Sequence, residues 1–474
     1  MLVGAFTGYG GRAYGACTLD AAPPGTSTYH CSGDNTVNTT TQSINHVNAE
    51  VITDPSFGVN AAAGSAVTIT GDGALSYTDV YSSPLTAEQT GLSIRSNGDD
   101  GITTPGSVTV NTNGVVSGAL GIGAYNNGSG MLTVTANGDV TSTTDFGILA
   151  INSGTDLTVT TGVGTTVFGP RGGILAVNDG SGKLTVTANG DVKSDDPNST
   201  GILAWNRYGT DLIVTTGVGT TVIGGFEGIQ AENHGSGMLS ITAKGSVTGT
   251  NPYSSGILAE NYSGTDITVT TDAGTTVAGE DRGIEAWNFG SGSLTVTANG
   301  DVTGTGRAGI SAENKGTYLK VTTGVGTTVT GGNNGISAGN NGSGMLTVIA
   351  NGNVSSEGSG ISAENNSGTF LSVTTGEGTT VTGGENGIDA QNSGSGALTV
   401  TANGNVSGTG SYGTGISAQN GSDTPAGTDL TVTTGAGTTV SHPGRRTMPS
   451  TGTTSHPASP CKTASWNPST GGCG

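Results

Sequence analysis

The sequence predicts an all-β chain folded as a right-handed, three-sided parallel β-helix, with about twelve regular rungs of 25–28 residues and degenerate rungs before them. Three observations predict this fold. A six-residue pattern, Gly-Ile-x-Ala-x-Asn, occurs twelve times at that spacing. Each repeat also holds two shorter strand-like pieces, so one unit has three sides. Finally, 88 of 474 residues are Gly and only 10% are charged, whereas about a quarter are charged in ordinary globular domains.

The repeated pattern begins at Gly121-Ile122, and the Ile of its last copy is Ile416. Period-two alternation places the Ile and Ala on one face of a strand, which we assign to the interior. The Asn that closes each copy is expected to hydrogen-bond its counterpart one rung away, as identical amides do in in-register stacks. We therefore predict a structural Asn ladder without a ligand role, formed by Asn126, Asn152, Asn178, Asn206, Asn233, Asn261, Asn288, Asn314, Asn340, Asn365, Asn392 and Asn420.

The second piece of each rung is Leu-Thr-Val-Thr or a relative, first at 132–135, and the third centres on a single Val, first at Val140. The connection between these pieces alternates from rung to rung. One form contains Asn-Gly, as at 189–190, and predicts a tight turn with positive φ. The other is Thr-Gly-Val-Gly-Thr-Thr, as at 161–166. The genetic repeat is therefore a two-rung unit of 52 or 55 residues.

The quality of the repeat divides the chain into four segments. Residues 1–57 are irregular and predict an N-terminal cap over an otherwise exposed strand edge. Residues 58–120 hold degenerate rungs, and residues 121–440 hold the regular ones. Residues 441–474, rich in Pro, Ser and Thr, have two interpretations: a disordered tail, or the next rung translated in a shifted reading frame. We expect the shifted frame, because the pattern stops abruptly inside a repeat.

Charge and cysteine usage limit the partners. A net charge of −20 argues against nucleic acid, because phosphates are bound by clustered Lys and Arg. No run of 18 apolar residues exists, so we predict no transmembrane helix, and the first residues lack the basic region of a full signal peptide. Cys17 and Cys31 are expected to form a disulfide in an oxidising compartment, with two free thiols as the alternative. We predict no cofactor and no metal ion.

The two variable positions of Gly-Ile-x-Ala-x-Asn point away from the core by the same alternation. They carry apolar residues in early rungs, such as Leu149 and Ile151, and carboxylates with tryptophans in later ones. Such an exposed patch marks a binding site unless a loop or the N-terminal segment covers it, and both interpretations are open. The predicted ligand-binding face consists of Tyr125, Trp205, Glu232, Glu260, Glu285, Trp287 and Glu313.

Catalytic signatures are scarce, and we predict that the protein is not an enzyme. His234 has no Ser or Cys nucleophile motif beside it, and we expect it to be solvent-exposed at a turn. Glu260 and Glu285, on adjacent rungs, are the carboxylates that a polysaccharide-acting enzyme would use, but no Lys or Arg cluster accompanies them. The outward Thr-x-Thr of the second piece, as at 133–135, resembles the ice-binding faces of antifreeze proteins, although the β propensity of Thr explains it adequately.

The repeated Gly-Ser-Gly-x-Leu-Thr-Val-Thr-Ala-Asn-Gly-Asp-Val, as at 180–192, resembles the passenger region of Gram-negative autotransporters. The stretch from Cys17 to Gly33 is similar to the start of such passengers, and the resemblance covers about residues 16–440. It implies export to the cell surface through the outer membrane. It also implies a C-terminal β-barrel in the full-length protein, before which this chain would be truncated.

Because adhesion is common among passengers, the resemblance further implies a surface-exposed or secreted adhesin-like stalk without catalysis. Its expected partner is a protein or glycan on a host or neighbouring cell, and we expect a monomer. The rival interpretations are a polysaccharide-acting enzyme on the same scaffold and an inert truncated fragment. Fold alone does not decide among these functions.

Overall fold

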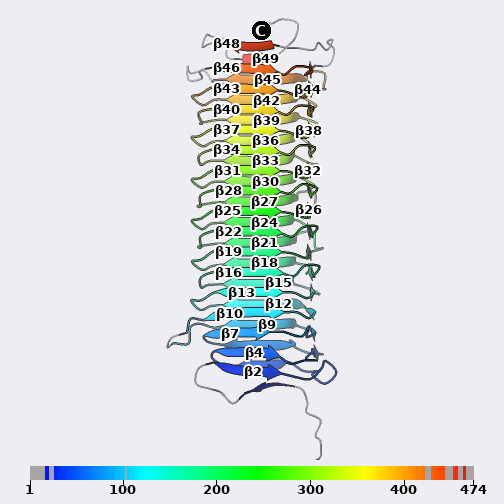
Figure 1. The fold of residues 1–474 in the computed structure, drawn as a ribbon, viewed down its shortest axis with the longest axis vertical. Helices are drawn as coiled ribbons and strands as arrows, with labels where there is room; N and C mark the ends of the chain where they lie inside the picture. The colour runs from blue at the N-terminus through cyan, green and yellow to red at the C-terminus, as the bar shows by residue number, and fades with distance from the viewer. Residues whose placement is uncertain are drawn as a thin grey trace, which may run out of the picture.

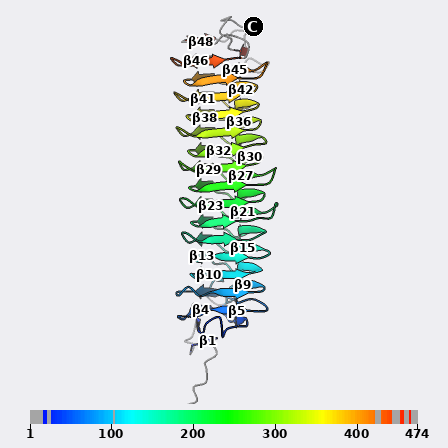
Figure 2. The same cartoon turned by 90° about the vertical axis from the view of Figure 1, so that its right-hand side faces the viewer.

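The computed structural model describes residues 16–20, 26–101, 104–421, 429–442, 452–456 and 463–465, and among these residues there are strands but no helix. Three sheets run along a solenoid of about 14 turns, and each turn of the chain adds one strand to each sheet. Figure 1 shows the rungs stacked from blue to red along the long axis, and Figure 2 shows the same stack from the side. The predicted β-helix fold is confirmed.

Sheet B, as we name it, contains the Gly-Ile-x-Ala-x-Asn strands. Each strand pairs in parallel with its next copy, so that Ile122 lies opposite Ile148 and Asn126 opposite Asn152. The strands of sheet B are β3 (Gln42–Asn45), β6 (Val67–Gly71), β9 (Thr90–Ser96), β12 (Leu120–Asn126), β15 (Phe146–Asn152), β18 (Gly172–Asn178), β21 (Thr200–Asn206), β24 (Glu227–Asn233), β27 (Ser255–Asn261), β30 (Arg282–Asn288), β33 (Ala308–Asn314), β36 (Asn334–Asn340), β39 (Ser359–Asn365), β42 (Asn386–Asn392), β45 (Thr414–Asn420) and β49 (Thr463–Ser465).

Sheet A contains the Leu-Thr-Val-Thr strands, again in register, with Leu132 opposite Leu157. The strands of sheet A are β1 (Cys17–Leu19), β2 (Ser27–Cys31), β4 (Ala49–Thr53), β7 (Ala74–Thr78), β10 (Ser107–Thr112), β13 (Leu132–Ala136), β16 (Leu157–Thr161), β19 (Leu184–Ala188), β22 (Leu212–Thr216), β25 (Leu239–Ala243), β28 (Ile267–Thr271), β31 (Leu294–Ala298), β34 (Leu319–Thr323), β37 (Leu346–Ala350), β40 (Leu371–Thr375), β43 (Leu398–Ala402), β46 (Leu430–Thr434) and β48 (Gly452–His456).

Sheet C contains the short strands around single valines, such as Val140 opposite Val167. The strands of sheet C are β5 (Val59–Ala61), β8 (Leu85–Ala87), β11 (Val116–Gly118), β14 (Val140–Ser142), β17 (Thr166–Phe168), β20 (Asp191–Lys193), β23 (Thr221–Gly224), β26 (Ser246–Gly249), β29 (Thr276–Gly279), β32 (Asp301–Gly304), β35 (Thr328–Gly331), β38 (Asn353–Ser356), β41 (Thr380–Gly383), β44 (Asn405–Gly408) and β47 (Val440–Ser441).

The two ends of the described stack carry antiparallel strands. At the N-terminal end β1 pairs antiparallel with β2, and a disulfide joins Cys17 to Cys31. Parallel stacking starts with β2 against β4, inside the segment 1–57 for which the sequence predicts an irregular cap. At the other end β48 and β49 pair antiparallel with β46 and β45. Of the segment 441–474, only residues 441–442 and the backbone of these two strands are described, so the two interpretations of this tail fall largely outside the described residues.

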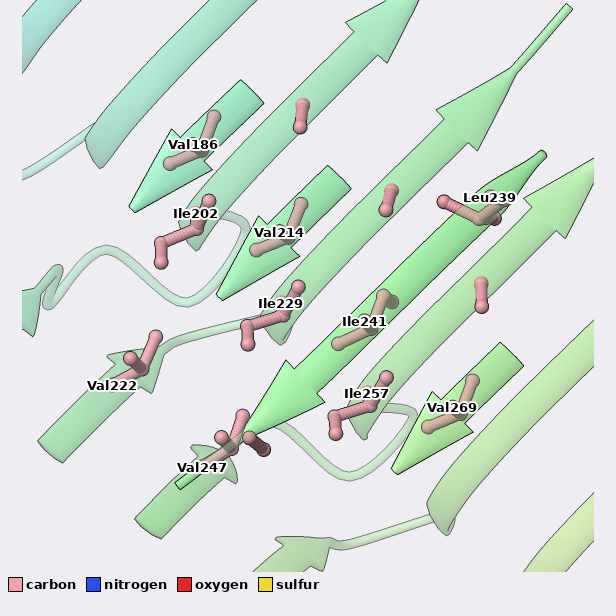
Figure 3. Close-up of a cluster of buried hydrophobic side chains, with 14 of the residues drawn as sticks. Val186, Ile202, Val214, Val222, Ile229, Leu239, Ile241, Val247, Ile257 and Val269 are labelled. Atoms are coloured by element: carbon pink, nitrogen blue, oxygen red, sulfur yellow. The ribbon is translucent and has the colours of Figure 1, made fainter. Parts of the chain in front are cut away.

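The core is a set of three apolar columns, one from each sheet. Ile229 and Ala231 from sheet B, Val214 from sheet A and Val222 from sheet C are all fully buried. Figure 3 shows how the Ile column of sheet B faces the Val columns of the other two sheets along several rungs. Because each strand is short, its apolar side chains are buried only when neighbouring rungs stack on it.

The twelve Asn side chains form the hydrogen-bonded ladder, with nearly all of them fully buried. Asn233 is typical: its Oδ1 accepts from Asn206 Nδ2 at 2.8 Å, and its Nδ2 donates to Asn261 Oδ1 at 3.2 Å. Its Nδ2 also donates to the carbonyl of Gly237, at 3.1 Å. Each amide therefore satisfies the turn of its own rung and links two rungs, which is a structural role.

The two alternating kinds of turn contact each other between rungs. Their backbone angles show that the prediction of positive φ in the Asn-Gly turn is wrong. Positive φ occurs at the second Gly of the long turn, as in Gly164 (φ 75°), and not at the Gly of the described Asn-Gly turns. Gly190 of an Asn-Gly turn is required for a different reason, since an added Cβ would lie 2.3 Å from the carbonyl oxygen of Thr165. The Gly190 N–H instead donates to the buried hydroxyl of Thr161 on the preceding rung, at 3.2 Å.

Candidate functional site

The outward face of sheet B is the chemically varied surface of the rod. In the regular rungs the outward positions of sheet A are mainly Thr, with Lys320 as the charged exception, and those of sheet C are mainly Thr and Ser. Sheet B presents carboxylates, aromatic rings, arginines and apolar side chains instead. Thr has a high β propensity, so Thr at the outward positions is sufficient for a face that serves only as scaffold. The variety on sheet B therefore identifies it as the candidate functional face.

The structure brings together most of the sequence-predicted ligand face. Trp205, Glu232, Glu260, Trp287 and Glu313 occupy one continuous column, each opposite the next on successive strands from β21 to β33. Of the other two predicted residues, Tyr125 has the same register position on an earlier rung, separated from Trp205 by Ile151 and Val177. Glu285 stands in the neighbouring column, opposite Leu258.

Tyr125 lies three rungs before Trp205 and does not join the cluster. The Arg95 guanidinium covers its ring at 4.3 Å from the centroid. Burial raises the pKa of its phenol.

An aromatic column runs beside the first one, at the positions just after the ladder Asn. The ring of His234 stacks on Tyr262 with centroids 4.2 Å apart, and Tyr262 stacks on Phe289 at 5.5 Å. Cations close both ends: Arg207 lies over Trp205 at 3.9 Å, and Lys315 lies over Phe289 at 4.5 Å. The faces of these rings are occupied by neighbours, so the column stabilises the rungs and presents ring edges.

The sequence predicts His234 to be a solvent-exposed residue at a turn, and the structure places it directly after strand β24 with its side chain partly exposed. Its side chain is only about a third exposed, at 36%. Besides stacking on Tyr262 within the aromatic column, its ring contacts the first column, with Nε2 3.6 Å from the Glu232 carboxylate. The period-two argument covered only the variable positions inside the repeat, and the residue two beyond the second variable position continues the same outward face.

Three carboxylates on this face are buried, although alternation directs two of them, Glu260 and Glu285, outward and so predicts their exposure. Glu227, Glu285 and Glu260 are 3%, 5% and 8% exposed. The Ser255 N–H donates to Glu227 at 2.6 Å, and the Ser255 hydroxyl donates to Glu285 at 3.1 Å. Adjacent rungs lie only one strand spacing apart, so long side chains on neighbouring strands cover one another.

The same packing shifts the protonation of these groups. Burial, with Glu285 and Glu260 nearby, raises the pKa of Glu227 to about 8. Burial and the neighbouring Glu232 raise the pKa of Glu260. Burial also raises the pKa of Glu285, although the Arg282 guanidinium, 3.2 Å away, opposes the shift. We call these side chains, together with the two columns, the acidic–aromatic patch; it consists of Trp205, Arg207, Glu227, Glu232, His234, Glu260, Tyr262, Arg282, Glu285, Trp287, Phe289, Glu313 and Lys315.

We expect Glu227→Gln to stabilise the chain at alkaline pH and to remove a pH dependence. Folded Glu227 releases its proton near pH 8, whereas an unfolded Glu does so near 4.5. Between these values the folded chain holds more protons than the unfolded chain, so wild-type stability falls as the pH rises. Urea unfolding midpoints across this interval measure the effect. Glu377→Gln, at an exposed turn, is the control, and equal slopes for wild type and Glu227→Gln would contradict the prediction.

Sequence reasoning missed Glu227 and Arg282 as well as the aromatic column. Both stand two residues before the repeated Ile, opposite Ser255 on the strand between them. The structure shows seven-residue strands here, one residue longer than the Gly-Ile-x-Ala-x-Asn pattern. Extending the alternation one step beyond the second variable position reaches the aromatic column, as at His234. Glu227 and Arg282 have the parity of the core Ile, so alternation would not have placed them on the outer face. Nor would it have shown which of these residues are covered.

Two negative findings apply to the described part of the chain. Among those residues, no group of three or more His, Cys, Asp or Glu side chains is placed to hold a metal ion. None of the described segments forms a helix of the length and hydropathy needed to cross a membrane.

No family model, curated protein or solved structure matches this chain. The class is therefore defined by the structure itself. It is a parallel β-solenoid in which two faces carry mainly Thr and Ser and one face carries varied, partly buried functional groups.

Proposed function

We propose that the protein is a surface-exposed or secreted stalk that binds a protein or glycan of a host or neighbouring cell through the acidic–aromatic patch, without catalysis. The observation that supports it is the concentration of carboxylates and aromatic rings on sheet B, while the other two faces carry mainly Thr and Ser. Burying Glu227 and Glu260 raises their pKa, so these side chains reduce stability at neutral pH, and a pure scaffold would not need them.

The resemblance to autotransporter passengers supports the part of the proposal that places the protein outside the cell. A passenger is exported and folds outside the cell, where a disulfide such as Cys17–Cys31 persists. The rod form separates a binding face from its point of attachment, which suits a stalk. The net charge of −20 favours a partner whose contacting surface is neutral or basic.

We expect charge reversal within the patch to weaken binding to cells by about tenfold or more, since interface energy concentrates in few residues. The variants are Glu232→Lys and Glu313→Lys, and the control is Glu377→Lys, which makes the same change of charge on an exposed turn. The measurement is a titration of fluorescently labelled chain on a panel of epithelial and bacterial cells.

Two outcomes would overturn the proposal. One is the absence of wild-type binding to every cell in the panel. The other is an equal loss with Glu377→Lys, because the effect would then come from net charge and not from the patch. Retained binding by both patch variants would move the site elsewhere.

A further inference from the structure

A second feature of sheet B is a hollow of about 420 Å³ on rungs β15 to β21, before the patch begins. Phe146 and Leu203 give it an apolar lining, and Arg171, Asp196, Asn198 and Thr200 give it a polar one. Its volume falls within the range of small-molecule sites, which also combine apolar walls with a few polar groups. The acidic–aromatic patch shares none of these residues.

One strand position beside the hollow, Gly172, carries no side chain. Gly172 lies opposite Phe146 on one side and Thr200 on the other. A Cβ added at Gly172 would lie 2.7 Å from Cε1 of the Phe146 ring. The ring therefore extends over the Gly172 backbone, and the space beside it stays open. The Arg171 guanidinium lies over the Phe146 ring, 5.5 Å from its centroid, so a ligand in the hollow would contact the ring beside this cation.

The polar wall is a loop that the protein holds in place. Residues 194–199 form one of the longer connections from sheet C to sheet B, and Asp196 N donates to Pro170 O at 3.2 Å. The Asn198 N–H donates to Asp196 Oδ1 at 2.9 Å. Two rungs further on, Asn251 Nδ2 donates to Pro197 O at 3.0 Å. A loop fixed before binding loses little conformational entropy when a ligand arrives.

The charges around the hollow select the class of ligand. Arg171 is 64% exposed and lies 3.4 Å from Asp145, so its guanidinium keeps donors directed to solvent and opposes a cation. Asp195 and Asp196, on a chain of net charge −20, oppose an anion. The remaining chemistry is a neutral molecule with one apolar face and several hydroxyl groups.

We propose that this hollow binds an uncharged pyranose sugar residue. The C–H face of the sugar lies against Phe146 and Leu203, since an aromatic ring offers a broad apolar surface. Its hydroxyl groups accept hydrogen bonds from Arg171 and donate to the Asp196 carboxylate, and Asn198 can do both. The site goes beyond the proposed function, because it lies outside the patch and names a ligand class of its own.

The test uses the folded chain and a panel of methyl glycosides of glucose, galactose, mannose and N-acetylglucosamine, measured by saturation-transfer NMR and titration calorimetry. We expect at least one glycoside to bind. Arg171→Ala, at an exposed position, should weaken that binding roughly tenfold by removing charge-assisted hydrogen bonds. Gly172→Leu should abolish it by filling the hollow. Gly339→Leu is the control, because within 4 Å a Cβ added there meets only Glu313 Cγ, at 3.9 Å.

Either of two results overturns this site: no glycoside binds, or binding persists in both Arg171→Ala and Gly172→Leu. Arg171→Ala keeps the test decisive if Gly172→Leu does not fold. The cell-binding titration separates the two proposals. If sugar binding is absent while Glu232→Lys still weakens cell binding, only the sugar site fails. If a glycoside binds the hollow while Glu232→Lys leaves cell binding unchanged, only the patch proposal fails.

Discussion

Replacing Asn233 by Ala should lower the free energy of unfolding by about 3–5 kcal/mol, because several buried hydrogen bonds lose a partner at once. The amide is fully buried and takes part in four hydrogen bonds. Without it, the N–H of Gly235 loses its Oδ1 acceptor, 3.2 Å away, and the ladder is interrupted between β21 and β27. Urea unfolding measures the loss, and amide hydrogen exchange should show it concentrated on these rungs.

Asn366→Ala provides the matched control for the ladder. Asn366 follows a ladder residue directly, is exposed, and donates one hydrogen bond to Asn341 at 2.9 Å. Its removal should change stability by no more than about 0.5 kcal/mol, as is usual for surface sites. If the two substitutions cost the same, the ladder is not a major source of stability.

Gly264→Ala should be the second most damaging of these changes, at about 3 kcal/mol, because overpacking against backbone cannot be relieved by a rotamer change. The added Cβ would lie 2.1 Å from the carbonyl oxygen of Gly237 and 2.5 Å from the Asn261 side chain. Rungs must therefore separate locally, or the ladder amide must move. Thermal and urea unfolding of the purified variant measure the cost.

Gly274→Ala separates this steric effect from backbone strain. Gly274 has φ 79°, and an added Cβ meets nothing within 4 Å. The expected cost is only that of placing a side chain at positive φ, roughly 1–2 kcal/mol. A larger loss at Gly274 than at Gly264 would mean that turn conformation, and not the close approach of rungs, limits stability.

The fold could be predicted because each residue of the repeat has one physical role that recurs. Ile229 and Asn233 sit in a pattern repeated twelve times, and the structure places them in the core column and the ladder. The positive φ was assigned to the wrong turn, because Asn-Gly is a strong turn signal in isolation. In the stack, Gly190 is needed to avoid the Thr165 carbonyl, which is a contact between rungs. A single-rung argument does not contain that contact.

The candidate site could be predicted only in part, because its burial also depends on contacts between rungs. Alternation correctly directs Glu260 and Glu285 away from the core, but it does not say what lies beyond them. Their burial depends on which side chains stand on the rungs above and below, such as Arg282 beside Glu285. The hollow likewise lies beside Gly172, a strand position without a side chain between two rungs that carry one. Such features depend on which side chains stand next to each other on neighbouring rungs. An alternation argument applied to one rung does not contain that information.

The buried hydroxyl of the long turn has a consequence for how such a rod changes in length. Thr161, Thr216, Thr271, Thr323 and Thr375 stand opposite Ala on the following rung, and each accepts a hydrogen bond from a Gly N–H there. Duplicating or deleting one rung would bring two Thr, or two Ala, together and leave that partnership unmatched. Growth or loss in steps of two rungs, roughly 10 Å of rod, preserves every junction. In this protein the two-rung sequence repeat therefore has the same length as the shortest segment that can be added or removed without leaving a Thr hydroxyl unpaired.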